Sequence, residues 1–255
     1  MFVNAIVRPP APSLVAGLTT FLELGVPDYD LAIVQHQNYV QALVDCGVEV
    51  SVLNPLEAYP DSCFVEDVAL LTEKLAILTN PGAKSRQGEV FEIAPILNAF
   101  YKDNITRITT PATVDAGDIL RIDDHFYIGL SQRTNVEGAQ QISQLLTALG
   151  FTASTIVLRE FLHLKTGVSY LGHGYLLVSG ELINHPQFSQ FKQLPVVATE
   201  IYAANCILVN GIVLMPAGFP KTKKMIQDMG LSVRTLDVSE FRKIDGGLSC
   251  LSLRF

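Results

Sequence analysis

Residues 204–218, ANCILVNGIVLMPAG, decide the fold class, because they contain two short apolar runs joined at Asn210-Gly211. Both turn residues tolerate the positive φ that a two-residue type I′ turn requires, so this segment predicts a β-hairpin. The same order of strand, tight turn and strand recurs in three other segments. These are residues 64–82 with the tip at Glu73-Lys74, 115–131 with the tip at Asp123-Asp124, and 167–180 with the tip at Gly172-His173-Gly174.

Helical patterns lie between these hairpins, and each leads into another strand-length run. The helices are expected over residues 28–46, 86–101, 134–149 and 220–229, and the strands after them over 48–53, 105–109, 154–158 and 231–235. A unit of hairpin, helix and strand, about 45 to 50 residues long, recurs about five times, which predicts an α/β, propeller-like array. We expect one domain over residues 1–255. The last strand, 250–255, is expected to pair with residues 2–8, and the strand ends to converge on a central pit.

The composition excludes several classes of function. Of the 255 residues, 49% are hydrophobic and 17% charged, which suits a packed core and not a disordered chain. The net charge of −7 argues against a nucleic-acid or anionic-membrane partner, which requires a clustered basic surface. The apolar stretches are too short and interrupted for a membrane span. The four cysteines show no CxxC pairing and the start MFVNAIVRPP lacks a secretory signal, so we expect a reduced, cytoplasmic enzyme.

A cysteine, a histidine and several carboxylates suggest nucleophilic catalysis. Cys250 follows the diglycine at 246–247, and His163 lies in the segment LHLK. A Cys/His pair that is distant in sequence but close in the fold is typical of an activated thiol. Acidic residues that could join this pair lie beside predicted strands: Asp61, Glu66, Asp67, Asp115 and Asp118.

Taken singly, these residues have ordinary interpretations. Cys250 on a terminal core strand would more often be a packing residue, and aspartates most often cap turns. Arg86 and Arg133 stand at the starts of predicted helices, where a cation gains nothing from the dipole, and this misfit hints at a ligand carboxylate. The histidines expected at the surface or in caps are His36, His125, His173 and His185, and the cysteines expected in the core are Cys46, Cys63 and Cys206. No HxxxH or Cys-rich spacing indicates a metal site.

Eight short segments, taken in order, resemble the dimethylarginine dimethylaminohydrolases of the guanidine-modifying superfamily. They are FVED (64–67), NPG-x-x-SR-x-GE (80–89), DAGDIL (115–120), GLSQRTN (129–135), LHLKTG (162–167), YAANC (202–206), MPAG (215–218) and RKIDGG-x-SC-x-SLRF (242–255). One such motif is a weak signal, but eight in order over the whole chain are specific. The resemblance implies a five-bladed α/β propeller of the compact bacterial form.

Motif positions then imply roles for individual residues. Cys250 is expected to be the nucleophile and His163 the general acid/base. Asp67 and Asp115 are expected to hold the guanidinium, position 115 being either Glu or Asp in the family. The remaining expected contacts are Arg86 and Arg133 with the substrate α-carboxylate, Leu18 in a flexible lid, Asp61 and Glu66 near the same pocket, and Ile244 through its backbone carbonyl.

The implied reaction is hydrolysis of Nω-methylated L-arginine to L-citrulline and an alkylamine through an S-alkylthiouronium on Cys250. No metal or organic cofactor is expected, and a homodimer is compatible with the resemblance. Two nearby carboxylates oppose a thiolate, so we expect a thiol that ionises mainly when the cationic substrate binds. Arginine deiminase, citrulline hydrolase and amidinotransferase activities stay open as alternatives, as does a non-catalytic propeller that binds a partner protein. The preference among unmethylated, mono- and dimethylarginine is also open.

Overall fold

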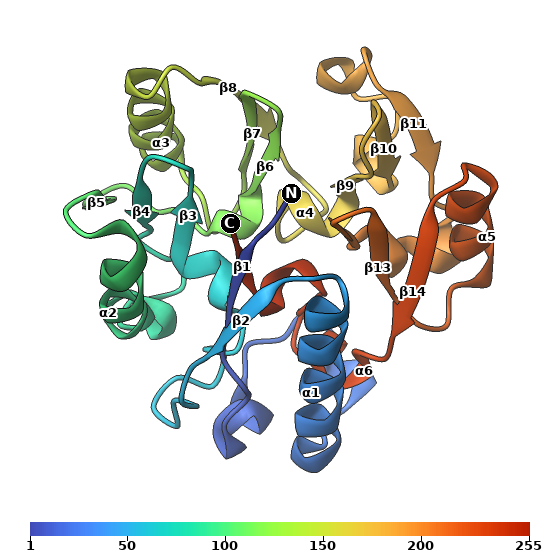
Figure 1. Ribbon diagram of the computed structural model, residues 1–255, viewed down its shortest axis with the longest axis horizontal. Coiled ribbons are helices and arrows are strands. Elements are labelled where there is room, and N and C mark those ends of the chain that lie inside the picture. Colours follow the sequence, from blue (N-terminus) through green and yellow to red (C-terminus); the bar gives the residue numbers. More distant parts are fainter. The chain divides into compact units, whose positions relative to one another are not determined.

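The computed structural model describes residues 1–255 and contains five three-stranded sheets with helices between their strands (Figure 1). The chain divides into two compact units, one formed by Met1–Val65 with Val168–Phe255 and the other by Glu66–Gly167. Three sheets belong to the first unit and two to the second. The single domain expected from the sequence stays a prediction.

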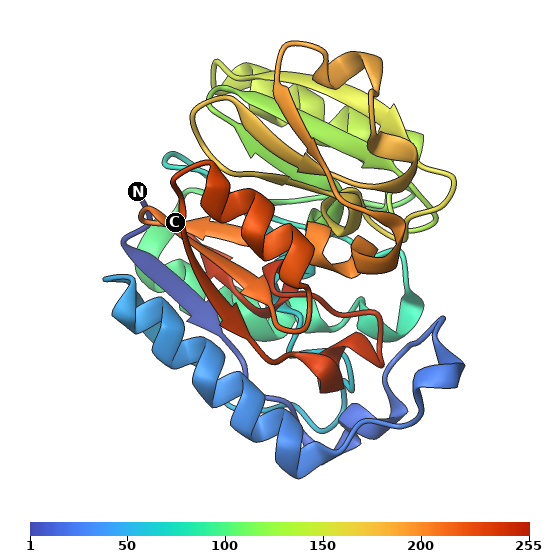
Figure 2. The ribbon, with the colours of Figure 1, turned by 90° about the vertical axis from the view of Figure 1, so that its right-hand side faces the viewer.

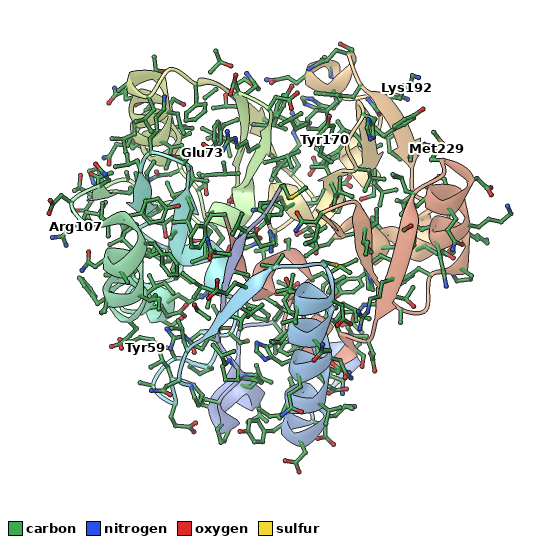
Figure 3. All side chains as sticks on the ribbon, in the orientation of Figure 1. Tyr59, Glu73, Arg107, Tyr170, Lys192 and Met229 are labelled. Carbon is green, nitrogen blue, oxygen red and sulfur yellow. The ribbon has the colours of Figure 1, made fainter.

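The Glu66–Gly167 unit holds two sheets of the same design. In each, two antiparallel strands form a hairpin, and a third strand joins the second in parallel after a helix. The first sheet comprises β3 (Ala69–Leu71), β4 (Ala76–Leu78) and, after α2 (Glu89–Tyr101), β5 (Ile105–Arg107). The second comprises β6 (Ile119–Ile122), β7 (His125–Leu130) and, after α3 (Val136–Ala148), β8 (Thr152–Val157). Glu73, which is labelled in Figure 3, lies at the first hairpin tip and forms an ion pair with Arg121 of β6.

The other unit holds three sheets. One follows the same design and confirms the hairpin, helix and strand expected over residues 204–235, with β12 (Ile207–Val209), β13 (Ile212–Pro216), α5 (Pro220–Asp228) and β14 (Ser232–Leu236). A second combines β9 (Val168–Tyr170), β10 (Tyr175–Val178) and β11 (Lys192–Pro195). The third joins both ends of the chain: β1 (Asn4–Val7) pairs in parallel with β2 (Glu49–Val52) and antiparallel with β15 (Leu253–Arg254).

Helix α1 (Tyr29–Asp45) runs alongside the β1–β2 strands (Figures 1 and 2). Its inner face packs into the core of this unit with Tyr39 and Leu43, against Phe241 of the short helix α6 (Ser239–Arg242). The Tyr39 hydroxyl lies 2.6 Å from Ser252 Oγ, so the helix is also tied to the segment before β15.

Local signals in the sequence explain the ends of these elements. Asn210 and Gly211 have φ values of 48° and 91°, which confirms the type I′ hairpin. Asp28 caps α1 by accepting from the Leu31 N–H at 3.0 Å, and Asn135 caps α3 by accepting from the Gly138 N–H at 2.8 Å. Hairpins and caps depend on neighbours a few residues away, so they were predictable.

Two expectations were wrong, and one strand was missed. Cys250 does not lie on the terminal strand but in the 3₁₀ turn η9 (Ser249–Leu251) before it. Strand β11 was not among the predicted strands; it follows β10 through the 3₁₀ turns η6 (Gly180–Leu182) and η7 (Pro186–Phe188). His36 is not at the surface: it is 2% exposed on α1, and burial lowers the pKa of its imidazole to about 4.

Candidate active site

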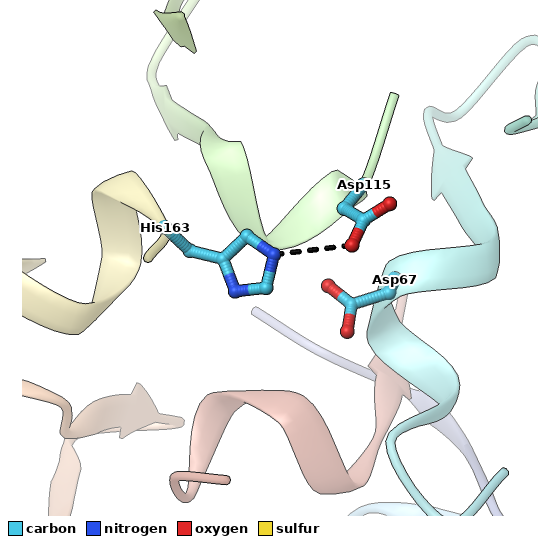
Figure 4. A group of neighbouring side chains, drawn as sticks. All are labelled: Asp67, Asp115 and His163. Carbon is cyan, nitrogen blue, oxygen red and sulfur yellow. Dashed lines mark hydrogen bonds and ion pairs between the residues drawn. The ribbon is translucent and has the colours of Figure 1, made fainter. Parts of the chain in front are cut away.

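The centre of the candidate site in the Glu66–Gly167 unit is the pair formed by His163 and Asp115. Asp115 precedes the 3₁₀ turn η5 (Ala116–Asp118), and His163 precedes the short helix α4 (Leu164–Gly167). His163 Nε2 lies 3.2 Å from Asp115 Oδ2, both side chains are buried, and Asp67 lies beside them (Figure 4). The second oxygen of Asp115 accepts from the Gly82 N–H at 2.9 Å. Asp115 is therefore held by the backbone on one oxygen and contacts the imidazole with the other.

Asp67 is held in a similar way from the 3₁₀ turn η3 (Val65–Val68). Its Oδ1 accepts from the Gly117 N–H at 3.0 Å, and its Oδ2 accepts from Arg86 at 2.6 Å. A Cβ on Gly117 would lie 2.7 Å from Asp67 Oδ1 and 3.1 Å from His163 Cγ. The glycine of the DAGD motif is thus needed because the backbone passes directly against both side chains.

The carboxylates keep His163 protonated. Burial lowers the pKa of His163, but the negative charge of Asp67, the hydrogen bond with Asp115 and the charges of Asp118 and Asp115 outweigh burial and raise it to about 9. Burial raises the pKa of Asp67, but the positive charges of His163 and Arg86 lower it to about 2. At neutral pH the cluster therefore holds an imidazolium, which can donate a proton to a leaving group.

Asp118 connects the segments that carry His163 and Arg133. Its Oδ1 accepts from the Leu164 N–H at 3.0 Å, and its Oδ2 accepts from Ser131 Oγ at 2.7 Å. Ser131 Oγ in turn accepts from the Arg133 N–H at 2.9 Å. Burial raises the pKa of Asp118 to about 6, against the opposing effects of the His163 charge and of hydrogen bonds from the Ser131 and Thr134 side chains. The sequence suggested only a turn cap here, and the signal for a larger role was its place as the last residue of DAGD.

The two arginines do not lie where the sequence placed them. Arg86 ends the 3₁₀ turn η4 (Lys84–Arg86), and Arg133 lies in the loop between β7 and α3, so neither begins a helix. Arg86 is buried, pairs with both carboxylate oxygens of Glu89 and with Asp67, and has its pKa raised by these charges although burial opposes the rise. The Arg133 side chain is 16% exposed, with Nη1 3.9 Å from Asp115 Oδ2.

Glu66 also has a partner that the sequence did not indicate. Its Oε1 lies 2.7 Å from Nζ of Lys165, which belongs to the LHLK segment beside His163. FVED and LHLK are thus joined by one ion pair while their neighbours Asp67 and His163 interact electrostatically. Two motifs about a hundred positions apart in the chain therefore form one cluster.

Cys250 lies in the other unit, 9% exposed, within the core that includes Ile244 and Leu248. The 3₁₀ turn that carries it is held from the YAANC segment, because the Asn205 side chain bonds both the N–H and the hydroxyl of Ser249 at 3.0 Å. On the other side of Gly247, the Tyr202 hydroxyl donates to the Gly246 carbonyl at 2.7 Å. Asn205 and Tyr202 are contacts that the sequence analysis did not assign.

Leu18, Asp61 and Ile244 lie together in the same unit. The Leu18 N–H donates to Asp61 Oδ1 at 2.9 Å, and a Cβ on Gly17 would lie within 3.2 Å of both Asp61 Oδ1 and Ile244 Cδ1. The Leu18 side chain is 37% exposed. The segment is also bound further along, since the N–H and the hydroxyl of Thr20 donate to the two oxygens of Asp245 at 2.8 and 2.9 Å. Asp61 and Asp245 thus hold the segment after Gly17.

Comparison with known proteins decides the family. A sequence profile described as "N,N dimethylarginine dimethylhydrolase, eukaryotic" matches residues 28–201. The chain is 50% identical over 255 residues, all of both proteins, to the N(G),N(G)-dimethylarginine dimethylaminohydrolase of Pseudomonas aeruginosa. The chain belongs to the dimethylarginine dimethylaminohydrolase family. A relative of the same name from Streptomyces coelicolor is 35% identical over 98% of this chain and 96% of its own length.

Solved structures confirm the predicted fold class. The Pseudomonas aeruginosa dimethylarginine dimethylaminohydrolase, in a cysteine-to-serine mutant complexed with citrulline, matches with a TM-score of 0.98 at 49% identity over all of both chains. The N-terminal domain of a cyanobacterial arginine dihydrolase shares the fold alone, with a TM-score of 0.86 at 22% identity over 100% of this chain and 97% of that domain. The chain is a member of the five-bladed α/β propeller class.

A metal ion is a second kind of ligand to consider for the acidic cluster. One ligand atom from each of Asp67, Asp115 and His163 lies within 4.8 Å of the others. Carboxylate and imidazole are suitable donors for a divalent cation, but a cation at this site would have to displace the proton that His163 carries. The same two carboxylates suit the fork of N–H donors on a guanidinium, which is the ligand class of this dimethylarginine dimethylaminohydrolase family.

No helix of the structure has both the length and the apolar character that crossing a membrane requires.

Proposed function

We propose that this chain hydrolyses Nω-methylated L-arginine to L-citrulline and an alkylamine, with Cys250 as the nucleophile. The observation that carries the proposal is the buried cluster of His163, Asp115 and Asp67, in which two carboxylates accompany an imidazolium. Family membership adds support, since the Pseudomonas aeruginosa relative was solved with citrulline. A dimethylarginine dimethylaminohydrolase that is 49% identical to this chain, and in which a histidine is replaced by glycine, was solved as an adduct with S-methyl-L-thiocitrulline.

In the proposed complex, Asp67 and Asp115 hold the planar guanidinium. Each has one oxygen fixed by a backbone N–H, so the carboxylates are oriented before the substrate arrives. The substrate cation offsets the negative charge that opposes the Cys250 thiolate, and the thiol then loses its proton to solvent. Arg133 is the arginine we assign first to the α-carboxylate, because Arg86 already pairs with Asp67 and Glu89. Leu18, Asp61, Glu66 and Ile244 are proposed to complete the amino-acid end of the site.

The proposed reaction has two halves. The Cys250 thiolate attacks the guanidinium carbon, and the His163 imidazolium donates its proton to the alkylamine, which leaves as the C–N bond breaks. Neutral His163 then takes a proton from water, the resulting hydroxide attacks the S-alkylthiouronium, and the C–S bond breaks to release citrulline. The raised pKa of His163 suits the first half, in which a proton must be available at neutral pH.

One experiment tests substrate and chemistry together. The protein is incubated separately with arginine, monomethylarginine, asymmetric dimethylarginine and citrulline, and the products are identified by mass spectrometry. Methylamine or dimethylamine with citrulline supports the proposal, whereas ammonia from arginine alone would favour the deiminase alternative. Cys250→Ser should abolish turnover and still bind substrate, while Cys46→Ser, which changes a cysteine at the end of α1, serves as the matched control.

His163→Gly tests the assignment of the acid/base. We expect this variant to form a covalent adduct slowly and to stall, because no group remains to activate water. Full turnover by His163→Gly would show that a different base operates.

Location and assembly are further proposals. We propose a cytoplasmic location, which suits the four cysteines, all of them free in the structure. We also propose that the protein is a homodimer. Light scattering of the purified protein measures the assembly, and a mass near 27.8 kDa would contradict the dimer.

A further inference from the structure

The YAANC segment (202–206) has no role in the proposed reaction, yet it contacts the turn that carries Cys250. The segment ends the 3₁₀ helix η8 (Ala198–Ala204) and leads into β12. Its Asn205 is buried and reaches Ser249, which lies directly before Cys250 and is itself buried. All of these residues belong to the same unit.

The hydrogen bonds of Asn205 have a defined direction. The Ser249 backbone N–H can only donate, so the atom that faces it at 3.0 Å must be the Asn205 side-chain oxygen. The amide NH₂ then faces Ser249 Oγ, also at 3.0 Å, and donates to it. The Ser249 hydroxyl therefore acts as an acceptor toward Asn205, and its single proton is left to point elsewhere.

The sulfur of Cys250 is in reach of that proton. Ser249 Oγ lies 3.9 Å from Cys250 Sγ, a separation suited to a long hydrogen bond to sulfur. A thiolate accepts such a bond more strongly than a thiol, because an ionised acceptor strengthens a hydrogen bond. The bond therefore favours the nucleophilic form of the cysteine.

Close packing fixes this arrangement. A Cβ on Gly247 would lie 2.5 Å from Asn205 Cγ, and a Cβ on Gly246 would overlap the Phe64 ring. The diglycine therefore lets the turn press directly against Asn205 and Phe64. Tyr202 holds the Gly246 carbonyl from the same segment, so the YAANC segment binds the turn on both sides of Gly247.

We infer that Asn205 and Ser249 form a hydrogen-bond relay that directs the Ser249 hydroxyl proton at the Cys250 sulfur and stabilises its thiolate. The inference rests on the proposed role of Cys250 as the nucleophile. Ser249, which contacts the reacting sulfur, is then a catalytic residue, and Asn205 is the positioning residue that sets the direction of the hydroxyl.

Other ionisable groups of this unit also face the turn. Burial and the charge of Cys250 raise the pKa of Tyr202 far above its usual value, so its phenol stays a neutral donor. The Arg242 guanidinium lies 4.8 Å from the centroid of the Tyr202 ring, and Arg254 donates to the Ser249 carbonyl at 3.1 Å. These groups are the same in the wild type and in all the variants below, so differences in the Cys250 pKa between the variants do not come from them.

The test measures the rate of alkylation of Cys250 by iodoacetamide as a function of pH, read by mass spectrometry on the peptide that contains it. Ser249→Ala removes the donor and should raise the apparent pKa of Cys250 by about one unit, which slows alkylation about tenfold at pH values below it. Ser249→Thr keeps a hydroxyl and should titrate close to the wild type. Equal titrations of Ser249→Ala and wild type would overturn the relay.

Asn205→Asp tests the direction of the relay without changing side-chain shape. Aspartate accepts the Ser249 N–H but cannot donate to Ser249 Oγ, so the hydroxyl must turn its proton toward the new carboxylate and away from the sulfur. The new negative charge also opposes the thiolate and so raises the pKa of Cys250 by itself. The double variant Asn205→Asp/Ser249→Ala measures this charge effect alone, because it has no hydroxyl at position 249. If the relay exists, Asn205→Asp raises the apparent pKa of Cys250 more in the wild-type background than in the Ser249→Ala background. Equal increases in the two backgrounds would overturn the relay.

The alkylation test does not depend on turnover. If the variants shift the pKa of Cys250 as expected but none of the four compounds of the product assay is converted, the proposed function fails and the relay stands. If citrulline is produced but the titrations of all variants coincide, the relay fails and the proposed function stands. Circular dichroism identifies any variant that does not fold. If Ser249→Ala is such a variant, Asn205→Asp, which keeps the shape of the side chain, provides the decisive titration, and an unchanged pKa of Cys250 in it would overturn the relay.

Discussion

Asp115→Asn is the substitution that most directly tests why His163 is protonated. Asp115 accepts from the Gly82 N–H with Oδ1 and contacts His163 Nε2 with Oδ2. Asparagine has the same shape but only one acceptor. If its oxygen keeps the Gly82 N–H, its NH₂ faces Nε2, which must then be an unprotonated acceptor. If the amide turns round, the buried Gly82 N–H loses its acceptor, which is also unfavourable.

The expected shift follows from the contacts that are lost. A hydrogen bond to a charged group contributes about 1.5–3 kcal/mol, and one pKa unit corresponds to about 1.4 kcal/mol. Losing the Asp115 contact should thus lower the pKa of His163 from about 9 to between about 7 and 8. Asp67 and Asp118 keep their charges, so the pKa should not fall to the value of a buried, unpaired histidine such as His36.

NMR titration of the histidine ring protons measures this pKa directly. The signal of His163 is assigned by its loss in His163→Gly, and the matched control is Asp123→Asn. Asp123 is an exposed carboxylate at a hairpin tip, with a φ of 52° that asparagine also tolerates. A His163 pKa that stays near 9 in Asp115→Asn would refute the argument that Asp115 keeps His163 protonated.

The same pair makes stability depend on pH. The pKa of His163 is raised on folding from 6.5 to about 9, so its stabilising contribution is complete below pH 6.5 and is lost as the pH rises through 9. The free energy of unfolding of the wild type should therefore fall by up to about 3 kcal/mol over this window. Asp115→Asn should show a smaller fall, measured by urea denaturation at a series of pH values.

The remaining predictions each concern one contact. Arg133→Ala should raise KM for methylarginine about ten- to a hundredfold with little change in kcat, because it removes a charged contact with the α-carboxylate, and an unchanged KM would refute that role. Gly247→Ala should lower the free energy of unfolding by about 1–3 kcal/mol, since its Cβ would lie 2.5 Å from Asn205 Cγ; an unchanged urea midpoint would contradict this close approach. Thr20→Val removes the hydroxyl bond to Asp245 and should speed hydrogen exchange over residues 18–24, whereas equal exchange would mean that the N–H bond alone holds the segment.

Much of the candidate site was predictable from motif positions. His163, Asp115 and Asp67 were expected to act together, and the structure brings them into one buried cluster. What the motifs did not predict were the contacts around that cluster. The pairing of Arg86 with Glu89, the ion pair of Glu66 with Lys165 and the bonds of Asp118 depend on where side chains point after packing. Only the folded arrangement determines which donor satisfies which acceptor.

The sequence by itself determined the elements and the pattern of their repetition. The Asn210-Gly211 hairpin and the Asp28 and Asn135 caps are set by contacts within a few residues, which the chain carries wherever it folds. Only the tertiary structure decided that Cys250 lies in a turn held by Asn205, because those residues are more than forty positions apart. It alone also decided that His36 is buried, because an amphipathic helix does not reveal which of its polar residues the core will cover.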